Sequence, residues 1–477
     1  MFKRKAHSDL NMIEGPLLVK ILIFTLPLMA TNLLQTFYNA ADMMVVSLSS
    51  EPNSVGAIGA TGPMINLVLN IFLGLGVGAN VIVARKIGSR DDEQVSKALH
   101  TAMTLSVILG IMGMIVGIII DEPALRAMGA QDNLLELAAL YTRIYFFGVP
   151  FISITNFAIA IFRARGDTKT PLIVLTITGF ANVLMNFLFV LAFEMTVDGV
   201  ALATLLSNAM SATILVTLMV KDKGICHFSF KKIRIDSKSF KEILLIGIPA
   251  SLQGALFSIS NIMIQSSILK VNNMKAPVGE KIQPVMNGNS AMANLEGFIY
   301  TATNSVYQAS VTFTSQNVGA GKYRRVYRVM GSCYFITGCI AIIFSGIIAI
   351  FKNQLLLLYG VSSVDTNPLQ VLAYESAITR MYYVAIPYIL LAFMEVGSGI
   401  LRGLGKSLTS TIVSFIGSCL LRIIWLLTVF RAYMNLEMVY VSYPISWALT
   451  ALISLALSLV ILRKKIIFKE KISKLNI

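Results

Sequence analysis

The sequence predicts an all-α integral membrane protein with twelve transmembrane helices arranged as two six-helix repeats. Three observations lead to this fold class: the composition, twelve long apolar runs, and a set of motifs that recur in order. Of the 477 residues, 56% are hydrophobic and only 13% are Asp, Glu, Lys or Arg, whereas soluble domains carry about 25% charged residues. The mean hydropathy of +0.75 agrees with this composition, which excludes a disordered chain, a fibre and a water-soluble enzyme.

Twelve apolar runs are each long enough to cross a bilayer, which takes about 20 mostly apolar residues in a helix. The runs are longer than the roughly ten-residue strands of membrane barrels and lack their two-residue alternation, so helices are expected. The predicted helices cover residues 17–46, 55–84, 94–120, 136–162, 168–193, 198–220, 240–270, 288–316, 325–351, 374–401, 408–431 and 438–463.

The positions of Lys and Arg predict the orientation. If both termini are cytoplasmic, thirty of the 39 basic residues fall in inside segments, among them Arg165 and Arg402, and six fall in outer loops. This bias is the one that cytoplasmic loops show, and it explains the net charge of +15 without a nucleic-acid partner. Three arginines lie within apolar runs; we expect Arg143 and Arg380 to extend to the outer surface from helix ends, and the third is Arg422.

Short motifs of the first half recur in the second half in the same order. Each match is weak alone, but together they extend across six helices per half. They pair Thr142-Arg143-Ile144-Tyr145 and Pro150 with Thr379-Arg380-Met381-Tyr382 and Pro387, Pro27 and Asn39 with Pro249 and Asn261, Gly88 with Gly319, and Arg163-Ala164-Arg165-Gly166 with Arg402-Gly403-Leu404-Gly405.

These matches predict an N-terminal six-helix lobe over residues 1–225, a cytoplasmic linker over 226–238 and a C-terminal six-helix lobe over 239–477. Two lobes of like orientation imply a pseudo-two-fold axis along the membrane normal. Such repeats are typical of transporters, with the substrate path between the halves. A duplicated scaffold of helices is the alternative interpretation.

Five stretches of the sequence match one known family in order. They are Pro27 to Asp42 with its Asn39-x-x-Asp42 ending, the Phe162 to Pro171 stretch, Asn182, Gly199 to Thr204, and Leu401 to Gly405. Through these residues the chain resembles the multidrug and toxic compound extrusion (MATE) transporters over about residues 15–463. The resemblance implies secondary active export of small amphipathic or cationic compounds, driven by inward flow of protons or sodium. It also implies a bacterial inner-membrane protein, and we expect a monomer among membrane lipids, without a cofactor or a bound metal.

Charged groups deep in a bilayer are costly and are functional hypotheses by default. Asp42 is the first of three such acids. It either lies solvated at the outer interface or binds the coupling ion, and the resemblance places the coupling acid of the N-terminal half here. In the family, partners on helices 5 and 6 complete that site; here they are Asn182, Asn186 and Thr204.

Position 186 departs from the family, because many relatives that use this site have Asp there. A single carboxylate weakens the case for sodium, which favours charged oxygen ligands, although amide and hydroxyl oxygens can still coordinate it. We therefore expect protons to be the coupling ion. Plain interhelical hydrogen bonding is the alternative role for Asn182 and Asn186.

Glu296 and Glu395 are the other two deep acids, and we expect them to attract a cationic substrate. The alternative is that Arg422 pairs with one of them and neutralises it. Aromatic faces attract cations, so some aromatic residues are candidates for the cavity lining, although packing is the more common role. The substrate-binding candidates beside the two acids are Asn39, Tyr38, Tyr300 and Phe257.

These features predict a drug and cation antiporter in which two lobes rock around a midplane cavity. The rival is a flippase for lipid-linked precursors from the same wider superfamily, which we expect to need a more cationic cavity. Three deep acids against one arginine favour cationic cargo. An enzyme is not expected, since Gly405-Lys406-Ser407 lacks the first glycine of a phosphate loop at Ile400 and no zinc-protease motif is present.

Overall fold

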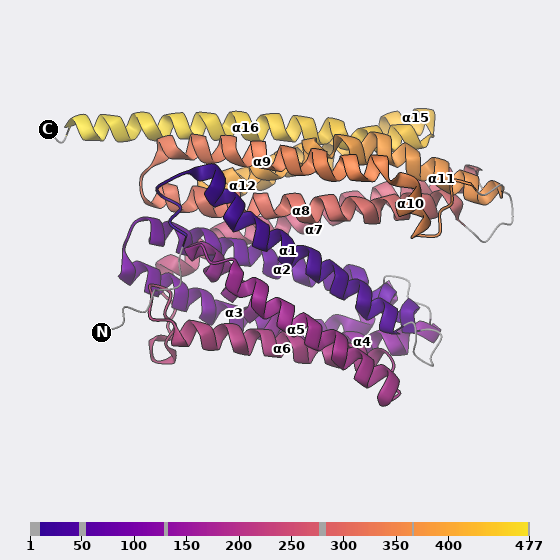
Figure 1. Ribbon diagram of the computed structural model, residues 1–477, viewed down its shortest axis with the longest axis horizontal. Helices are drawn as coiled ribbons and strands as arrows, with labels where there is room; N and C mark the ends of the chain where they lie inside the picture. The colour runs from indigo at the N-terminus through magenta and orange to yellow at the C-terminus, as the bar shows by residue number, and fades with distance from the viewer. Residues whose placement is uncertain (1–9, 47–53, 128–131, 276–282, 365–366, 476–477) are drawn as a thin grey trace. The chain divides into compact units, whose positions relative to one another are not determined.

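The computed structural model describes residues 10–46, 54–127, 132–275, 283–364 and 367–475, and every regular element in these ranges is a helix (Figure 1). The chain divides into two compact units. Unit 1 contains residues 1–15, 23–251 and 315–321, and unit 2 contains residues 16–22, 252–314 and 322–477. The division falls inside the seventh long helix, because most contacts of that helix up to Ser251 are made with unit 1.

The first six helices supply most of unit 1. Their observed bounds agree with the sequence-based ranges to within a few residues at most ends, and the largest difference is at the end of α3. They are α1 (Leu17–Val46), α2 (Ser54–Gly88), α3 (Asp92–Ala127), α4 (Asp132–Arg165), α5 (Lys169–Phe187), which continues as a π-helical turn (Leu188–Ala192), and α6 (Val197–Lys221).

The remaining helices supply most of unit 2. Between α6 and α7 the described chain has only a short 3₁₀ turn, Phe230–Lys232. The helices are α7 (Ser237–Lys275), α8 (Pro284–Gly319), α9 (Tyr323–Ile350), α10 (Lys352–Leu357), α11 (Pro368–Arg380), α12 (Ile389–Gly403), α13 (Ser407–Ser414), α14 (Leu421–Trp425), α15 (Arg431–Tyr433) and α16 (Leu436–Leu475).

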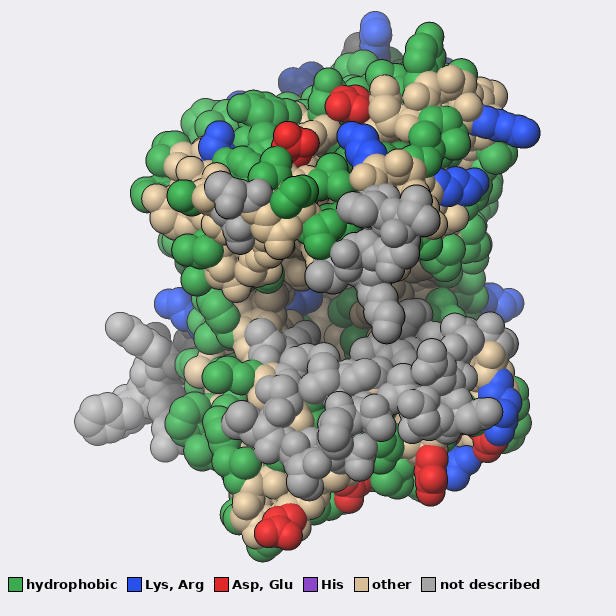
Figure 2. All heavy atoms as spheres, turned by 90° about the vertical axis from the view of Figure 1, so that its right-hand side faces the viewer, with side chains coloured by type: hydrophobic (Ala, Val, Ile, Leu, Met, Phe, Trp, Pro, Cys, Tyr) green, Lys and Arg blue, Asp and Glu red, His purple; other side chains and the backbone are tan. Residues whose placement is uncertain are grey.

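Within the described residues, eleven helical stretches are long and apolar enough to cross a membrane. Two of them, Pro368–Gly403 and Ser407–Tyr433, each combine consecutive helices. The twelfth long helix is α8, which is long enough but too rich in Asn, Ser, Thr and Gln. Lipid-facing positions explain the many large apolar side chains on the surface, such as Ile119 and Ile262. Figure 2 shows hydrophobic side chains over much of the described surface on one side of the molecule. A helix as polar as α8 instead needs protein or water around it.

Four π-helical turns interrupt the membrane helices, and each lies near a buried polar side chain. One begins two residues after Asn186, and another, Met381–Ala385, directly follows Arg380. The other two, Phe415–Leu420 and Leu426–Phe430, lie on either side of Arg422. Such turns are rare and often occur at functional sites, so they point to the same polar clusters that the sequence singled out.

The ends of α2 and α8 cross at two glycines within unit 1. A Cβ atom added at Gly88 would overlap the backbone carbonyl of Gln316, and one added at Gly319 would overlap that of Arg85. The contact is reciprocal, and the two glycines are the ones that the sequence repeat pairs.

We predict that Gly319→Ala destabilises the protein by about 1–3 kcal/mol, because the added methyl meets backbone atoms that cannot move aside cheaply. Thermal unfolding of the purified protein in detergent measures the change. Gly331→Ala on α9 is the matched control, since a Cβ there meets nothing within 4 Å and alanine favours a helix. Equal unfolding temperatures for the two variants would contradict the tight crossing.

Candidate functional site

The Asp42 carboxylate on α1 meets two asparagines of α5 inside unit 1. The Nδ2 group of Asn186 donates to Asp42 Oδ1 at 2.5 Å and lies 3.4 Å from the Oδ1 atom of Asn182. The two asparagines are buried and lie on one face of α5 because they are four residues apart. Three of the side chains that the resemblance brought together are therefore in contact.

Two buried oxygen atoms at the same helices have no hydrogen-bond partner among the described residues. They are Asn186 Oδ1 on α5 and Thr204 Oγ1 on α6. The Ser211 hydroxyl of α6 donates to Thr178 of α5 at 2.7 Å, which fixes these two helices against each other. An unpaired buried oxygen is costly, so this cluster has capacity for one more ligand.

The chemistry of Asp42 suits a cation as that ligand. An ionised carboxylate can only accept hydrogen bonds, whereas a protonated one also donates one. A proton on Asp42 would therefore give the site the donor that Asn186 Oδ1 lacks. A sodium ion could also use these oxygens, but only one carboxylate would balance its charge.

Tyr38 joins α1 to α5 one turn before Asp42. Its hydroxyl donates to the Thr176 backbone carbonyl at 3.2 Å, and its ring packs where a side chain at Gly179 would lie. The ring thus positions the Asp42 segment of α1 against α5, whatever contact it makes with a substrate. The side chain of Asn39, the other candidate on α1, lies outside the described residues.

Glu296 of α8 forms a buried, bidentate ion pair with Arg380 of α11. The Arg380 Nη2 and Nε atoms lie 2.6 and 2.9 Å from the two Glu296 oxygens. Arg380 Nη1 donates to Asn289 Oδ1 at 2.8 Å, and Tyr440 also donates to that oxygen. The expectation that Arg380 reaches the outer surface is wrong, because it is only 6% exposed and these partners replace the water it loses.

This pair also corrects the sequence-based alternative in which Arg422 neutralises Glu296. Removing two charges from water is favourable only when geometry and further hydrogen bonds compensate. The parallel two-bond arrangement, strong for a guanidinium and a carboxylate, meets that condition at Arg380. In this conformation the Glu296 carboxylate is therefore neutralised by Arg380 and does not attract a cationic substrate.

Arg143, by contrast, has a side chain that is 52% exposed. Its Nε atom lies 3.1 Å from Asp121 Oδ2, and the Thr142 hydroxyl donates to the same carboxylate. Asp121 is a buried acid that the sequence analysis missed, because the predicted helix ended at residue 120 whereas α3 continues to Ala127. An acid one residue beyond an apolar run was the only available signal.

Glu395 on α12 is the second deep acid of unit 2. It has no hydrogen bond and no ion pair within the described chain, and the charge of Arg402 acts on it. The half-exposed Tyr300 is in electrostatic contact with it. Both side chains are therefore available to a ligand, whereas Phe257 packs at the edge of the unit 2 core.

Arg402 is buried in the last turn of α12, so it is not an exposed loop residue. Its Nη2 group donates to Gln253 Oε1 at 2.7 Å, and Nη1 donates to the Tyr307 hydroxyl. Unit 2 therefore has three buried arginines, Arg380, Arg402 and Arg422. Its deep acids are two, Glu296 and Glu395. The sequence-based expectation is one deep arginine against three acids in the whole chain, two of them in this unit, whereas unit 2 alone has three buried arginines.

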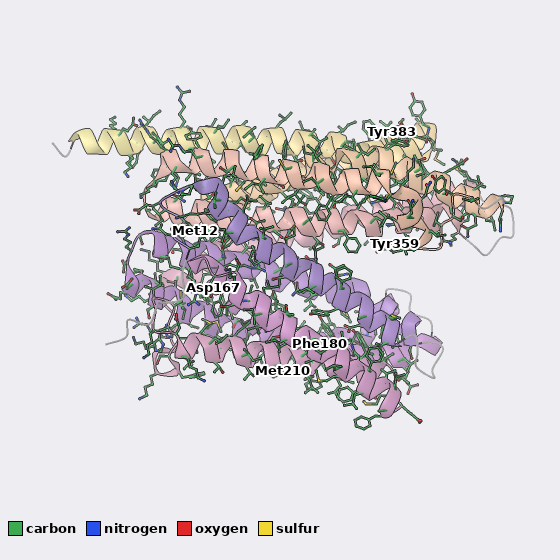
Figure 3. All side chains as sticks on the ribbon, in the orientation of Figure 1. Met12, Asp167, Phe180, Met210, Tyr359 and Tyr383 are labelled. Carbon is green, nitrogen blue, oxygen red and sulfur yellow. The ribbon has the colours of Figure 1, made fainter. Side chains whose placement is uncertain are left out.

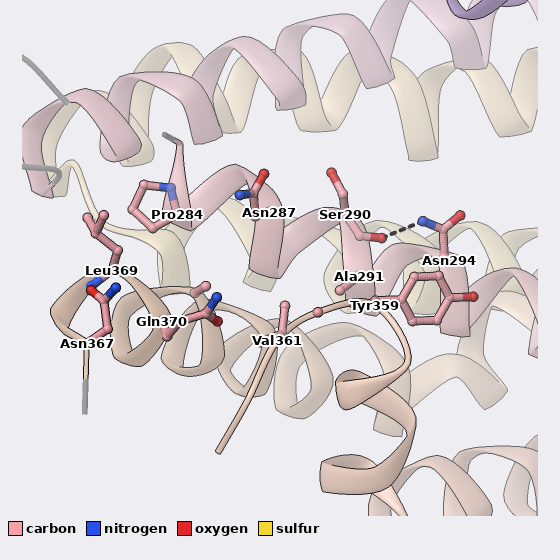
Figure 4. Close-up of a pocket in the computed structure, with 12 residues that line it drawn as sticks. Pro284, Asn287, Ser290, Ala291, Asn294, Tyr359, Val361, Asn367, Leu369 and Gln370 are labelled. Carbon is pink, nitrogen blue, oxygen red and sulfur yellow. Dashed lines mark hydrogen bonds between the residues drawn. The ribbon is translucent and has the colours of Figure 1, made fainter. Parts of the chain in front are cut away.

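A separate cavity of about 420 Å³ opens between α8 and α11 in unit 2. Its lining includes the polar residues Asn287, Ser290 and Asn294 of α8, Gln370 of α11 and Tyr359 (Figure 4). Among the described residues that line the cavity none is charged, and part of the polar surface of α8 borders it.

The turn between α4 and α5 is held by charged groups outside the membrane spans. Arg165 bonds Asp222 at 2.8 Å and Asp167 at 2.9 Å, and the Thr170 backbone and hydroxyl donate to Asp167, which is labelled in Figure 3. Burial alone would raise the pKa of the Asp167 carboxyl, but the bonds from Thr170 and Arg165 outweigh it and lower the pKa. Gly166 has φ +99°, which favours glycine.

We predict that Asp167→Asn lowers the free energy of unfolding by about 1 kcal/mol at neutral pH, because Thr170 and Arg165 lose a charged acceptor. A lowered pKa means that the stabilisation is complete above the unfolded-state value of about 4 and is lost as pH falls through the folded-state value. Thermal unfolding at pH 7 and near pH 3 measures it.

The exposed Glu194 provides the control, because Glu194→Gln removes an acid without a described partner. The difference in unfolding temperature between wild type and Asp167→Asn should shrink at low pH. An unchanged difference would contradict the role assigned to the Asp167 charge.

Comparison with known proteins identifies the family. The MatE family matches residues 27–188 and 258–427, one match in each half of the chain. The chain belongs to the MatE family. It is therefore a membrane transporter and not an enzyme, and the twelve-helix, two-lobe fold and the resemblance predicted from the sequence are confirmed.

Individual relatives agree with this assignment over most of the chain. The probable multidrug resistance protein YoeA of Bacillus subtilis strain 168 is 24% identical over 447 residues, which are 90% of this chain and 91% of YoeA. The multidrug export protein MepA of Staphylococcus aureus strain MRSA252 is 22% identical over 54% of this chain and 58% of MepA.

Solved structures agree in fold. One is an outward-facing multidrug resistance MATE family transporter of the MOP superfamily, with a TM-score of 0.86 and 21% identity. The alignment covers 97% of this chain and 99% of that transporter. A MOP superfamily transporter from Pyrococcus furiosus, whose binding pocket is described as having reverse polarity that suggests a different function, has a TM-score of 0.87 at 22% identity, with the same coverage of both chains.

Proposed function

We propose that this MatE protein is a proton-coupled exporter of small amphipathic compounds, working by alternating access between its two lobes. The observation that carries the proposal is the Asp42–Asn186 contact with unpaired oxygens beside it. The multidrug relatives support the cargo class. The distribution of basic residues supports an orientation with both termini in the cytoplasm, and a single chain carries the whole proposed path.

Proton uptake changes what the Asp42 cluster can bind. In the ionised state Asp42 accepts a hydrogen bond from the Asn186 amide group, and Asn186 Oδ1 has no partner among the described residues. A proton that enters from outside neutralises a charge in an apolar setting and adds one donor. Both effects favour tighter packing of α1 on α5, so protonation is the step that opposes cargo binding. A sodium ion would need a second negative ligand, which Asn186 does not provide.

Glu395 and Tyr300 are the proposed cargo contacts of unit 2. The carboxylate has no described hydrogen bond or ion pair, and the tyrosine ring beside it is 43% exposed. A carboxylate and an aromatic face together suit an amphipathic cation. Glu296 is excluded from this role while Arg380 holds it.

A second candidate function is transport of anionic, lipid-linked compounds. It is favoured by the three buried arginines of unit 2, which outnumber its two deep glutamates, the buried Glu296 and the partly buried Glu395. The Pyrococcus furiosus transporter, with its pocket of reverse polarity, offers a precedent for such a departure within the superfamily fold. The two candidates differ in the charge of the molecule exported.

We predict that Asp42→Asn abolishes ethidium efflux from energised bacterial cells at matched expression, down to the level of cells without the protein. The asparagine keeps the size of the side chain but cannot take up a proton. Glu136→Gln, which removes an exposed acid of α4, is expected to leave efflux unchanged. Dye retention measured by fluorescence gives both rates.

Full efflux by Asp42→Asn would contradict coupling at this carboxylate. If the wild-type protein exports no ethidium but moves an anionic amphiphile, the second candidate function replaces the first.

A further inference from the structure

Arg422 on α14 is a buried cation without an acidic partner in the part of the chain that the structure describes. The residue is 3% exposed. Its Nε atom donates to the Ser446 hydroxyl at 2.8 Å, and this is the one hydrogen bond that the described residues make with a group that has five N–H donors. The Nη2 atom is fully buried and unpaired.

The nearby acids do not supply the missing charge. Glu296 is bound bidentately by Arg380, and Glu395 responds to the charge of Arg402. The charged group that acts on Arg422 from outside its own helix is Arg380, which repels it. With three arginines against two glutamates, the interior of unit 2 carries one uncompensated positive charge.

Two aromatic rings pack against the Arg422 guanidinium, and neither accepts a conventional hydrogen bond from its N–H groups. The Arg422 Cζ atom lies 4.4 Å from the Tyr443 ring centroid and 5.6 Å from that of Trp447. Cation–π contacts are weaker than the desolvation penalty of an unpaired buried ion, so these rings orient the group without neutralising it. The unused donors all lie in the guanidinium plane, where they form a fork that suits an anion.

A second unpaired donor lies in the same cluster. The Nδ2 atom of Asn289 is buried without an acceptor, while its Oδ1 atom accepts from Arg380 and Tyr440. Asn289 is connected to Arg422 through Arg380, because Arg380 bonds Asn289 and the Tyr443 ring contacts both Arg380 and Arg422. Two buried, unpaired donors and a net positive charge in one cluster describe a site that needs an acceptor.

We propose that Arg422 is the centre of an anion-binding site in unit 2, which takes a small anionic group, either an inorganic anion of chloride size or the carboxylate of a cargo molecule. The anion lies in the guanidinium plane, accepts from Nη2 and cancels the excess charge. This site is separate from the Asp42 cluster, and its existence does not depend on which cargo the protein exports.

Tryptophan fluorescence provides a direct test. The chain has two tryptophans, Trp425 and Trp447, so Trp425→Phe leaves one reporter beside Arg422. The purified full-length protein in detergent is titrated with sodium chloride against sodium gluconate at constant ionic strength. We expect a saturable change in Trp447 emission and a saturable rise in unfolding temperature with chloride, both absent in Arg422→Gln.

Matched variants separate binding from folding. Arg431→Gln removes an exposed arginine close to the same span and is expected to respond to chloride as the parent does. Arg422→Lys keeps the charge but loses the fork, and is expected to raise the half-saturating chloride concentration about tenfold. In gluconate, Arg422→Gln should unfold at or above the parent's temperature because it removes an uncompensated charge.

Competition by benzoate distinguishes the two sources of the anion. Displacement of chloride by benzoate indicates a site that also takes cargo carboxylates, and no displacement indicates an inorganic anion alone. The proposal is overturned if emission and unfolding temperature are the same in chloride and gluconate, or if the response persists in Arg422→Gln. Because no transport is measured, failure here leaves the export proposal standing, and loss of export leaves this site standing.

Discussion

The penalty for placing charge in an apolar medium is the constraint on which the rest of this structure depends. Where partners are complete, as at Glu296 and Arg380, the charges are structural. Where partners are incomplete, the protein has capacity for a ligand. Asp42 has one amide donor, and Arg422 has one hydroxyl acceptor. The number of partners that a buried charge has therefore distinguishes structural residues from candidate binding residues better than the presence of the charge alone.

The two units use that constraint differently. In unit 1 the deep acid of α1 faces neutral amides of α5, and the proposed ligand there is a small cation. In unit 2 Arg380 and Arg402 bond residues of α8, Arg422 has no acidic partner among the described residues, and the excess charge is positive. The π-helical turns beside Asn186, Arg380 and Arg422 locally widen the helices at these positions. The two proposed ligands, a cation at Asp42 and an anion at Arg422, would therefore bind in different units.

Much of the fold follows from the sequence because lipid leaves the backbone little choice. An apolar run of bilayer length must form a helix, and the first predicted helix coincides with α1 at both ends. The meeting of Asp42 with Asn186 followed from a family resemblance. The pairing of Arg380 with Glu296 and the burial of Arg402 did not follow, because position along a helix indicates depth but not which side faces protein. Asp121 was missed because helix ends were placed where hydropathy falls.

Proton movement coupled to export in reconstituted vesicles tests the central claim, that Asp42 takes up the coupling ion, most directly. Purified protein in sodium-free proteoliposomes is given a gradient of ethidium, and a trapped pH indicator records the proton flux that the dye gradient evokes. The account predicts opposite flows of dye and protons in the wild-type protein and neither flow in Asp42→Asn. Dye transport without proton flux, or dye transport that appears only when sodium is added, would contradict it.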